Sequence, residues 1–491
     1  MGVTGGTGAK EVLRTAYRRV FRQERPGDKS KPVSGNANVT VTDFMIQAYT
    51  KPAFITTGRK LIDWILQYQV RNRIDLENGN KHLVLMFDRS DLVPVVKAHC
   101  QAKRNTCRPT VELPEIVEYD DRECLPSSCV EWGSALRNTR FRYMIFEFII
   151  KYVHNSIREM ISGDMSPAAK ATTSIFVDCP MEPTGRTYYG SEYLKGRTIE
   201  LTETGLPIPL VERGEADLKA KVWADHFITH SDAFKTRDVI VRSTDGDLMG
   251  TMTSRPLASC SSWEEGNHTV LVCIGKVPKS FKAFATGHTE YIDVRAMWED
   301  VFCGKQELAT QFVAYLACAG GDYNEGFRNI SAAALMKRFV KEQRMYSEHG
   351  IEPQLMPLQP VQLSHDTDEE VSLMAHPHDI ISHLQKYFVK SKAPLRPRTA
   401  PTDADRKKGK RTKDFTIPWC VKRTARRVAW TIDYWQNKGV PCGEMYRGWH
   451  KLGGRWYPII SRVSRSSDGP AEPGLYVQTE SGYQHIPNEA P

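Results

Sequence analysis

Residues His82–Asp88 read HLVLMFD. A short apolar run bounded by polar residues is typical of a strand that is buried on both faces of a parallel sheet. We therefore expect a strand from His82 to Phe87 that presents Asp88 at its carboxyl end.

Two further stretches share this pattern. Val39–Thr42 is β-branched throughout and is followed by Asp43, and Asp238–Ser243 is followed closely by Asp245. β-branched residues favour strands, and a helix is expected between the first two strands at Lys60–Val70. Strands that alternate with helices predict a parallel α/β sheet, whose ligands bind beyond the carboxyl ends of the strands. The acids that follow these strands therefore form one candidate site.

Length and composition describe an ordinary globular protein. The chain has 491 residues, of which 40% are hydrophobic and 25% charged, so it can bury a large core and is not disordered throughout. We expect no membrane span, because no run of 18 apolar residues is present. Eleven cysteines without a C-x-x-C pair indicate neither a disulfide framework nor a zinc knuckle.

The positive charge is concentrated in one segment. The net charge is +9, and residues 390–427 hold fourteen Lys and Arg against three Asp, which is +11 and leaves −2 for the rest. Such a segment is typical of phosphate binding, although a solvated basic linker has the same composition. The candidate nucleic-acid contacts within it are Lys407, Lys408, Lys410 and Arg411.

Five units are expected along the chain from turn-forming residues and charge. Residues 1–110 form the first part of a core, residues 111–205 a cap or arch insertion, residues 206–350 the second part of the core, residues 351–413 a linker with the basic segment, and residues 414–491 a small tryptophan-rich module. Helices are expected at Ala9–Gln23, Val93–Cys107, Ser134–Ile161, Leu218–Phe227, Lys305–Cys318 and Ser331–Glu348.

Acids recur where these strands end and where helices begin. Glu215 and Asp217 lie in the stretch GEAD, Asp245 and Asp247 in STDGDL, and Asp322 in GGDY. Taken singly, such an acid is more often a turn or cap residue. Taken together, converging acids suit two-metal hydrolysis of a phosphodiester, because two divalent cations must be neutralised while water and substrate oxygens stay bound.

These motifs resemble the flap endonuclease family, the XPG-like 5′ nucleases of the PIN-like superfamily. The shared features are Met-Gly-Val before a helix, the strand-end Asp43, Phe-Asp at 87–88, and the GEAD, TDGDL and GDY motifs, over about residues 1–345 with gaps. The resemblance implies a PIN-like α/β fold with a mainly parallel sheet flanked by helices. It also implies two Mg²⁺ or Mn²⁺ ions held by Asp43, Asp88, Glu215, Asp217, Asp245, Asp247 and Asp322, with Asp88, Glu215 and Asp245 as the catalytic acids.

A basic helix after Asp88 fits the same family. Lys97 and Arg104 are seven residues apart and so share one helix face, with Lys103 beside them. The resemblance implies that Lys97 and Arg104 stabilise charge on the scissile phosphate, that Lys103 contacts nucleic acid, and that Gly2 lies near the site. A solvated basic helix and an ordinary flexible start are the alternatives.

The chain also departs from the family. The turn at Asn324–Ser331 has Asn and Ser where glycines are expected, and Asp217 stands where Glu is usual. No sliding-clamp motif is present, since Ile381–Phe388 is better explained as an amphipathic helix. Five tryptophans in 415–457 favour the core of a small domain over base stacking. This divergence suggests a member from a large DNA virus or a distant eukaryote.

The resemblance implies a monomeric, structure-selective nuclease that cuts DNA at a junction, flap or 5′ end in replication, repair or recombination. We expect it inside the cell, in the nucleus or at sites of viral replication, and not secreted. Two alternatives stay open, an RNA-cleaving member of the superfamily and a catalytically inactive PIN-like protein that binds nucleic acid. The seven acids argue against the inactive form, because carboxylates crowded without metal repel one another.

Overall fold

The computed structural model describes most of the chain between Gly6 and Ile486. The described residues are 6–24, 37–44, 51–87, 92–94, 112–136, 138–178, 198–209, 216–236, 238–243, 246–253, 268–273, 289–321, 326–327, 330–352, 356, 358–362, 371–375, 377–388, 395, 421, 424–425, 428–429, 431–432, 435, 449–452, 455–462, 474–479 and 482–486.

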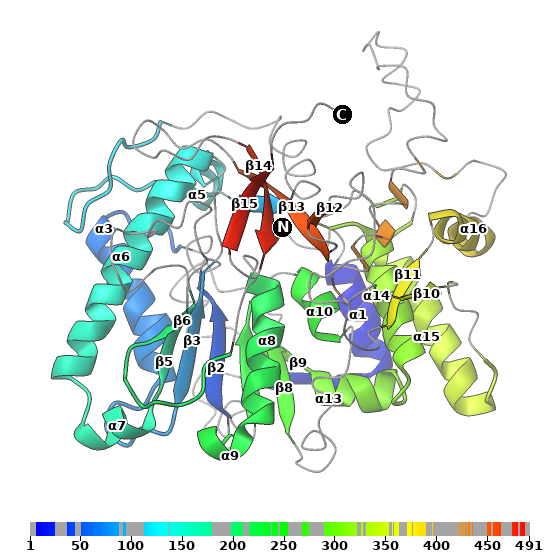
Figure 1. The fold of residues 1–491 in the computed structure, drawn as a ribbon, viewed down its shortest axis with the longest axis horizontal. Coiled ribbons are helices and arrows are strands. Elements are labelled where there is room, and N and C mark those ends of the chain that lie inside the picture. The colour runs from blue at the N-terminus through cyan, green and yellow to red at the C-terminus, as the bar shows by residue number, and fades with distance from the viewer. Residues whose placement is uncertain are drawn as a thin grey trace, which may run out of the picture.

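A mostly parallel sheet of eight strands forms the centre of the fold (Figure 1). Its order is β1 (Phe21–Glu24), β9 (Thr289–Asp293), β8 (Thr269–Cys273), β7 (Asp238–Arg242), β2 (Ala37–Asp43), β3 (His82–Met86), β5 (Ile175–Asp178) and β6 (Thr198–Glu200). The five strands from β8 to β5 are parallel, whereas β9, β1 and β6 pair antiparallel with their neighbours. The predicted α/β class with a parallel central sheet is thus confirmed.

The carboxyl ends of the parallel strands are aligned. Asp43 pairs with Met86, which in turn pairs with Asp178 on the other side of β3. Arg242 at the end of β7 pairs with Thr42 and with Cys273. The ends of five strands therefore form one edge of the sheet, and this edge is the place where α/β folds bind ligands.

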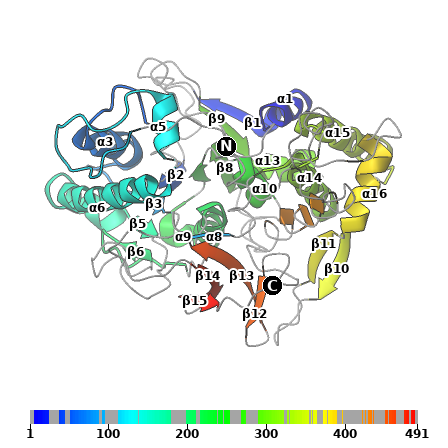
Figure 2. The ribbon, with the colours of Figure 1, turned by 90° about the horizontal axis from the view of Figure 1, so that it is seen from above.

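Helices cover both faces of the sheet (Figure 2). One face carries α1 (Gly6–Ala16), α8 (Ala216–Thr229), α10 (Gly246–Thr253), α14 (Gln306–Ala319) and α15 (Ala332–His349). The other face carries α3 (Gly58–Ile65), which continues to Val70, together with α5 (Cys129–Ala135), α6 (Thr139–Gly163) and α7 (Pro167–Thr172). Successive residues of β3 divide between the two cores, since Val84 and Met86 enter the first and Leu83 and Leu85 the second.

The remaining elements are short. They are α9 (Ser231–Phe234), α13 (Val294–Ala296) continued by a π turn at Met297–Val301, 3₁₀ turns at Arg18–Val20 and Arg71–Arg73, β4 (Leu92–Pro94), β10 (Leu358–Gln362), β11 (Val371–Ala375), α16 (Pro377–Phe388), β12 (Trp449–Leu452), β13 (Arg455–Arg462), β14 (Gly474–Thr479) and β15 (Gly482–Ile486). The strands β12 to β15 form a second sheet above the carboxyl edge in the view of Figure 1.

Three helix predictions are wrong in part. The helix expected at Ser134–Ile161 begins at Thr139, with Asn138 as its N-cap, because α5 ends at Ala135. The helix expected at Ala9–Gln23 ends at Ala16, and Phe21–Glu24 becomes an edge strand because β9 offers it a full antiparallel ladder. The helix expected from Val93 meets Pro94, which disfavours helical backbone at Val93, and Leu92–Pro94 instead pairs with β13. The rest of that predicted helix lies outside the described residues.

Parts of the chain that we assigned to separate units contribute to the main fold. From the expected cap, β5 and β6 extend the central sheet and α6 packs on one face of it. From the expected linker, α16 buries Ile380 and Leu384 in the main core, as the amphipathic pattern predicted. From the expected terminal module, Trp435 lies in the same core. The five-unit division stays a prediction.

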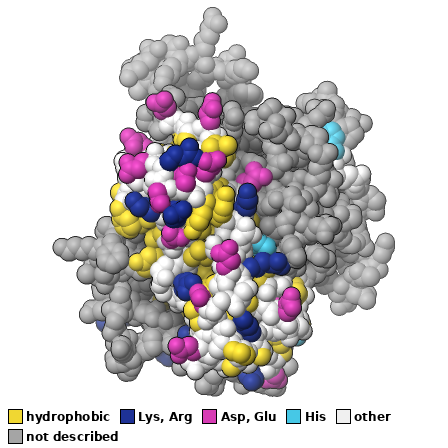
Figure 3. Space-filling model, turned by 90° about the vertical axis from the view of Figure 1, so that its left-hand side faces the viewer, with side chains coloured by type: hydrophobic (Ala, Val, Ile, Leu, Met, Phe, Trp, Pro, Cys, Tyr) yellow, Lys and Arg dark blue, Asp and Glu magenta, His cyan; other side chains and the backbone are white. Residues whose placement is uncertain are grey.

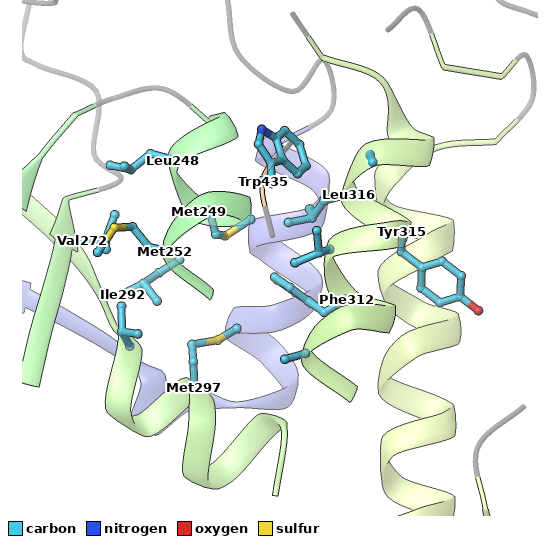
Figure 4. Packing of buried hydrophobic residues seen from close by; sticks show 14 of the residues in the cluster. Leu248, Met249, Met252, Val272, Ile292, Met297, Phe312, Tyr315, Leu316 and Trp435 are labelled. Atoms are coloured by element: carbon cyan, nitrogen blue, oxygen red, sulfur yellow. The ribbon is translucent and has the colours of Figure 1, made fainter. Parts of the chain in front are cut away.

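The buried face of α10 shows how this core closes. Met249 of α10 lies toward Leu316 of α14, Met252 extends toward Val272 of β8, and Trp435 lies above Met249 and Leu316 (Figure 4). Among the helices of the described ranges, none is both long enough and apolar enough to cross a membrane.

Candidate active site

Asp43 places a buried carboxylate at the end of β2. Its side chain is 5% exposed, and its Oδ2 accepts a hydrogen bond from Ser243 Oγ at 3.3 Å. Ser243 directly follows β7, the neighbouring parallel strand. The hydrogen bond therefore joins Asp43 to Ser243, the first residue of the stretch STDGD that contains the predicted acids Asp245 and Asp247.

Asp178 is a strand-end acid that the sequence analysis missed. It ends β5, is 1% exposed, and its Oδ1 lies 2.8 Å from Lys219 Nζ. Trp223 Nε1 donates to its Oδ2 at 3.0 Å. Its backbone oxygen accepts from Phe87 N at 3.1 Å, so the ends of β3 and β5 are held together.

Lys219 brings the first turn of α8 to the same edge. Besides the Asp178 carboxylate, its ammonium donates to Phe87 O at 3.3 Å and to Asp178 O at 3.4 Å. Phe87 immediately precedes Asp88, and Asp217 lies two residues before Lys219. A buried cation therefore lies beside two of the chain segments that carry predicted metal ligands.

Signals for both missed residues are present in the sequence. Ile175–Asp178 reads IFVD, an apolar run that ends in Asp as the other strands do, but its place inside the expected cap concealed it. Lys219 is followed at helical spacing by the buried Trp223, so it stands on the apolar face of α8 where a lysine requires a partner.

Aromatic rings fix the backbone beneath the site. The rings of Phe44 and Phe87 lie 4.8 Å apart at 50°. Phe44 follows Asp43 and Phe87 precedes Asp88, and both rings are buried in the second core. The two strand ends are thus anchored by packing as well as by the sheet.

The predicted site residues are described to different extents. Asp43 is described in full, whereas Asp217 and Asp247 are placed only as the second residues of α8 and α10. The others, Gly2, Asp88, Lys97, Lys103, Arg104, Glu215, Asp245, Asp322, Lys407, Lys408, Lys410 and Arg411, lie outside the described residues. Their roles stay predictions.

Within the described residues, no group of three or more His, Cys, Asp or Glu side chains is arranged to hold a metal ion. Six of the seven predicted ligands contribute no described side chain to that search. Asp43 supplies an oxygen donor of the kind that Mg²⁺ and Mn²⁺ prefer. Asp178 is a poor candidate ligand, because Lys219 already compensates its charge.

The turn after α14 brings two backbone segments into close contact. Gly320 has φ +84° and Gly326 has φ +64°, the left-handed region that favours glycine. A Cβ on Gly326 would lie 2.8 Å from Ala319 O. This position therefore requires glycine even though neighbouring residues depart from the family pattern.

The face with α3, α5 and α6 mixes charges of both signs (Figure 3). Its ion pairs include Arg59 with Asp121 at 3.0 Å and Arg122 with Asp120 at 2.5 Å. A basic surface for nucleic acid carries a concentration of Lys and Arg. The described part of this face therefore does not favour phosphate binding.

Comparison of the chain with protein-family models gives no match, and comparison with curated proteins gives no match either.

Proposed function

We propose that the chain is a PIN-like, metal-dependent nuclease that hydrolyses DNA phosphodiester bonds at a junction, flap or 5′ end. The observation that carries the proposal is the hydrogen bond from Ser243 Oγ to Asp43 Oδ2 at the aligned strand ends. It supports a common site for the acid after β2 and the acids after β7. Strand-end acids of parallel sheets face the ligand edge.

Chain connectivity supports the convergence of the other acids. Successive Cα atoms are about 3.8 Å apart, so Asp88 stays within one residue of Phe87 and Asp245 within two residues of Ser243. The contact of Lys219 with Phe87 O holds the first turn of α8, with Asp217, near the end of β3. Asp322 follows Gly321 at the end of α14, which packs against α10 in the main core.

The proposed chemistry assigns separate roles to acids and cations. The seven acids would hold Mg²⁺ or Mn²⁺, and two such ions would supply an activated water and stabilise the leaving oxygen. Lys97 and Arg104 would hold the scissile phosphate. The basic segment with Lys407, Lys408, Lys410 and Arg411 would contribute affinity without chemistry, because its many charges neutralise phosphates along the strand.

The test is a cleavage assay on labelled flap, gapped, blunt and single-stranded DNA, with matched RNA, in Mg²⁺ and in EDTA. We expect Mg²⁺-dependent cleavage with preference for a DNA junction or 5′ end. Absence of cleavage on every substrate, or cleavage that persists in EDTA, would contradict the proposal. Preferential cleavage of RNA would contradict its DNA part.

A further inference from the structure

We propose that Lys219 is a positioning residue, whose ammonium, held by Asp178, fixes the carboxyl end of β3 at Phe87 against the first turn of α8, the two elements that adjoin the predicted ligands Asp88 and Asp217. This inference rests on the proposed function, because it gives those two acids a shared task in binding metal.

The burial of the pair makes this assignment specific. Both side chains are 1% exposed, whereas in the pair of Arg338 and Glu342 on α15 the side chains are 24% and 6% exposed. A buried ammonium has to satisfy three N–H donors. Lys219 uses them on Asp178 Oδ1, Asp178 O and Phe87 O.

The acceptors link the pair directly to the candidate site. Phe87 O belongs to the peptide group that joins Phe87 to Asp88, and the atoms of a peptide group are coplanar, including the Cα of the second residue. A hydrogen bond to Phe87 O therefore restrains the orientation of the plane that leads to Asp88. The preceding peptide is held by the bond from Phe87 N to Asp178 O.

Stability alone does not account for such a pair. Replacing a buried ion pair by apolar residues of similar volume is often neutral or stabilising, because desolvation offsets the attraction between the charges. Groups that orient metal ligands, in contrast, lower metal affinity by about 10- to 100-fold when they are removed. The place of Lys219 between two ligand-bearing segments fits the second role.

Three variants of the full chain separate these roles. Lys219→Met removes the cation, Asp178→Asn keeps the cation and its bond to Phe87 O, and the double variant removes both charges together. The matched control is Arg338→Met with Glu342→Gln, a partly buried ion pair within α15. Mn²⁺ binding is measured by electron paramagnetic resonance of the free protein, and cleavage of a DNA flap is measured across Mn²⁺ concentrations.

For Lys219→Met and for the double variant, we expect the Mn²⁺ concentration at half-saturation to rise at least about tenfold, with much of the cleavage recovered at saturating Mn²⁺. For Asp178→Asn, we expect a smaller rise, below about threefold, because the bond to Phe87 O remains. The control should match the wild type.

Wild-type Mn²⁺ affinity in the double variant would overturn the proposal, since it would show that the pair only balances its own charges. A rise in the control equal to that in Lys219→Met would overturn it as well. If the wild type bound no Mn²⁺ and cut no substrate, the proposed function itself would be wrong, which is a result distinct from either of these.

Discussion

Asp43 and Asp178 occupy equivalent positions on the two sides of β3 but have different surroundings. Both end a parallel strand, both pair with Met86, and both are buried, at 5% and 1% exposed. Asp43 accepts a hydrogen bond from the Ser243 hydroxyl, which carries no charge. Asp178 faces the ammonium of Lys219 and the indole N–H of Trp223.

Position at a strand end therefore does not by itself identify a metal ligand. A hydroxyl donates a hydrogen bond but does not compensate a carboxylate charge, whereas an ammonium at 2.8 Å does so. A carboxylate that is already compensated gains less from a divalent cation. Lys219 therefore makes Asp178 the less suitable metal ligand of the two, and Asp43 stays a proposed ligand while Asp178 holds Lys219.

The largest expected effect is on cleavage. Asp43→Asn keeps an acceptor for Ser243 but removes the charge, and Asp245→Ala and Asp247→Ala each remove a proposed ligand. Loss of a group that only orients a ligand costs about 10- to 100-fold, so loss of the ligand should slow cleavage by about 10³-fold or more. Single-turnover cleavage of a DNA flap measures the rate, and a gel-shift assay should show that binding is retained.

Asp293 offers a matched control. It is a buried aspartate at the end of β9, but β9 is antiparallel to β8, so it lies at the opposite edge of the sheet. Its Oδ1 accepts from Ala296 N at 3.1 Å as the N-cap of α13, a role that Asn also performs, and its Oδ2 pairs with Arg22, a charge contact that Asn loses. Asp293→Asn should cleave like the wild type, and near wild-type cleavage by Asp43→Asn would remove Asp43 from the site.

The next largest effect is on the unfolding free energy, through the buried pair of Asp178 and Lys219. Lys219→Met leaves a buried carboxylate without its cation, and breaking a buried pair in this way costs about 3–5 kcal/mol of unfolding free energy. The double variant with Asp178→Asn should recover most of this loss, because no buried charge remains. Urea unfolding followed by circular dichroism measures both values. Equal destabilisation of the single and double variants would show that packing, and not charge, dominates here.

Sequence patterns predicted the elements that form this edge. The strands at Val39–Thr42, His82–Phe87 and Asp238–Ser243 are confirmed, because each is a short apolar or β-branched run with a polar end. The helices at Leu218–Phe227 and Ser331–Glu348 are confirmed for a similar local reason, their apolar periodicity.

Other features depend on contacts between distant parts of the chain. Phe21–Glu24 becomes a strand only because β9 lies beside it, and Leu92–Pro94 only because β13 does. The pairing of Asp178 with Lys219 spans 41 residues. Such contacts leave no periodic signal, so the pairing with Lys219 could not be predicted. The acid of β5 itself was missed because its local pattern lies within the expected cap.

At the amino end of β3, opposite the candidate site, His82 is expected to make the unfolding free energy depend on pH. His82 is the first residue of β3. Its Nδ1 accepts a hydrogen bond from Ser174 N, and its Nε2 lies 3.1 Å from Phe234 O. A ring with one accepting nitrogen is neutral. Burial lowers the pKa of His82 to about 4, against the opposing effect of its hydrogen bond with Phe234. The unfolded chain, with a pKa near 6.5, therefore takes up a proton more readily than the folded one.

The contribution of His82 to the unfolding free energy should thus be constant above pH 6.5 and fall as the pH is lowered from 6.5 to about 4. A pKa difference of this size corresponds to about 3 kcal/mol. His383, whose pKa burial also lowers to about 4, contributes over the same range. The measurement is therefore the difference in pH slope between the wild type and His82→Asn, and identical slopes would contradict the assignment to His82.

The smallest expected effect is a loss of stability on substitution in α10, the helix that begins directly after Asp245 and contains Asp247. A Cβ on Gly250 would lie 2.7 Å from the ring of Trp435, and that ring is 1% exposed and packed in the main core. Overpacking of this kind costs about 1–3 kcal/mol, which exceeds the roughly 1 kcal/mol that alanine gains over glycine in a helix. Gly250→Ala should therefore lower the unfolding free energy, as measured in urea.

Gly133 in α5 is the matched control, because a Cβ there has no described atom within 4 Å. Gly133→Ala should leave stability unchanged or raise it by up to about 1 kcal/mol. If Trp435 holds α10 in place, Gly250→Ala should also raise the Mn²⁺ concentration at half-maximal cleavage, since Asp247 lies in the first turn of that helix. Destabilisation without any change in Mn²⁺ dependence would show that the site tolerates movement of α10, and Asp43 would then depend on β2 and β7 alone for its placement.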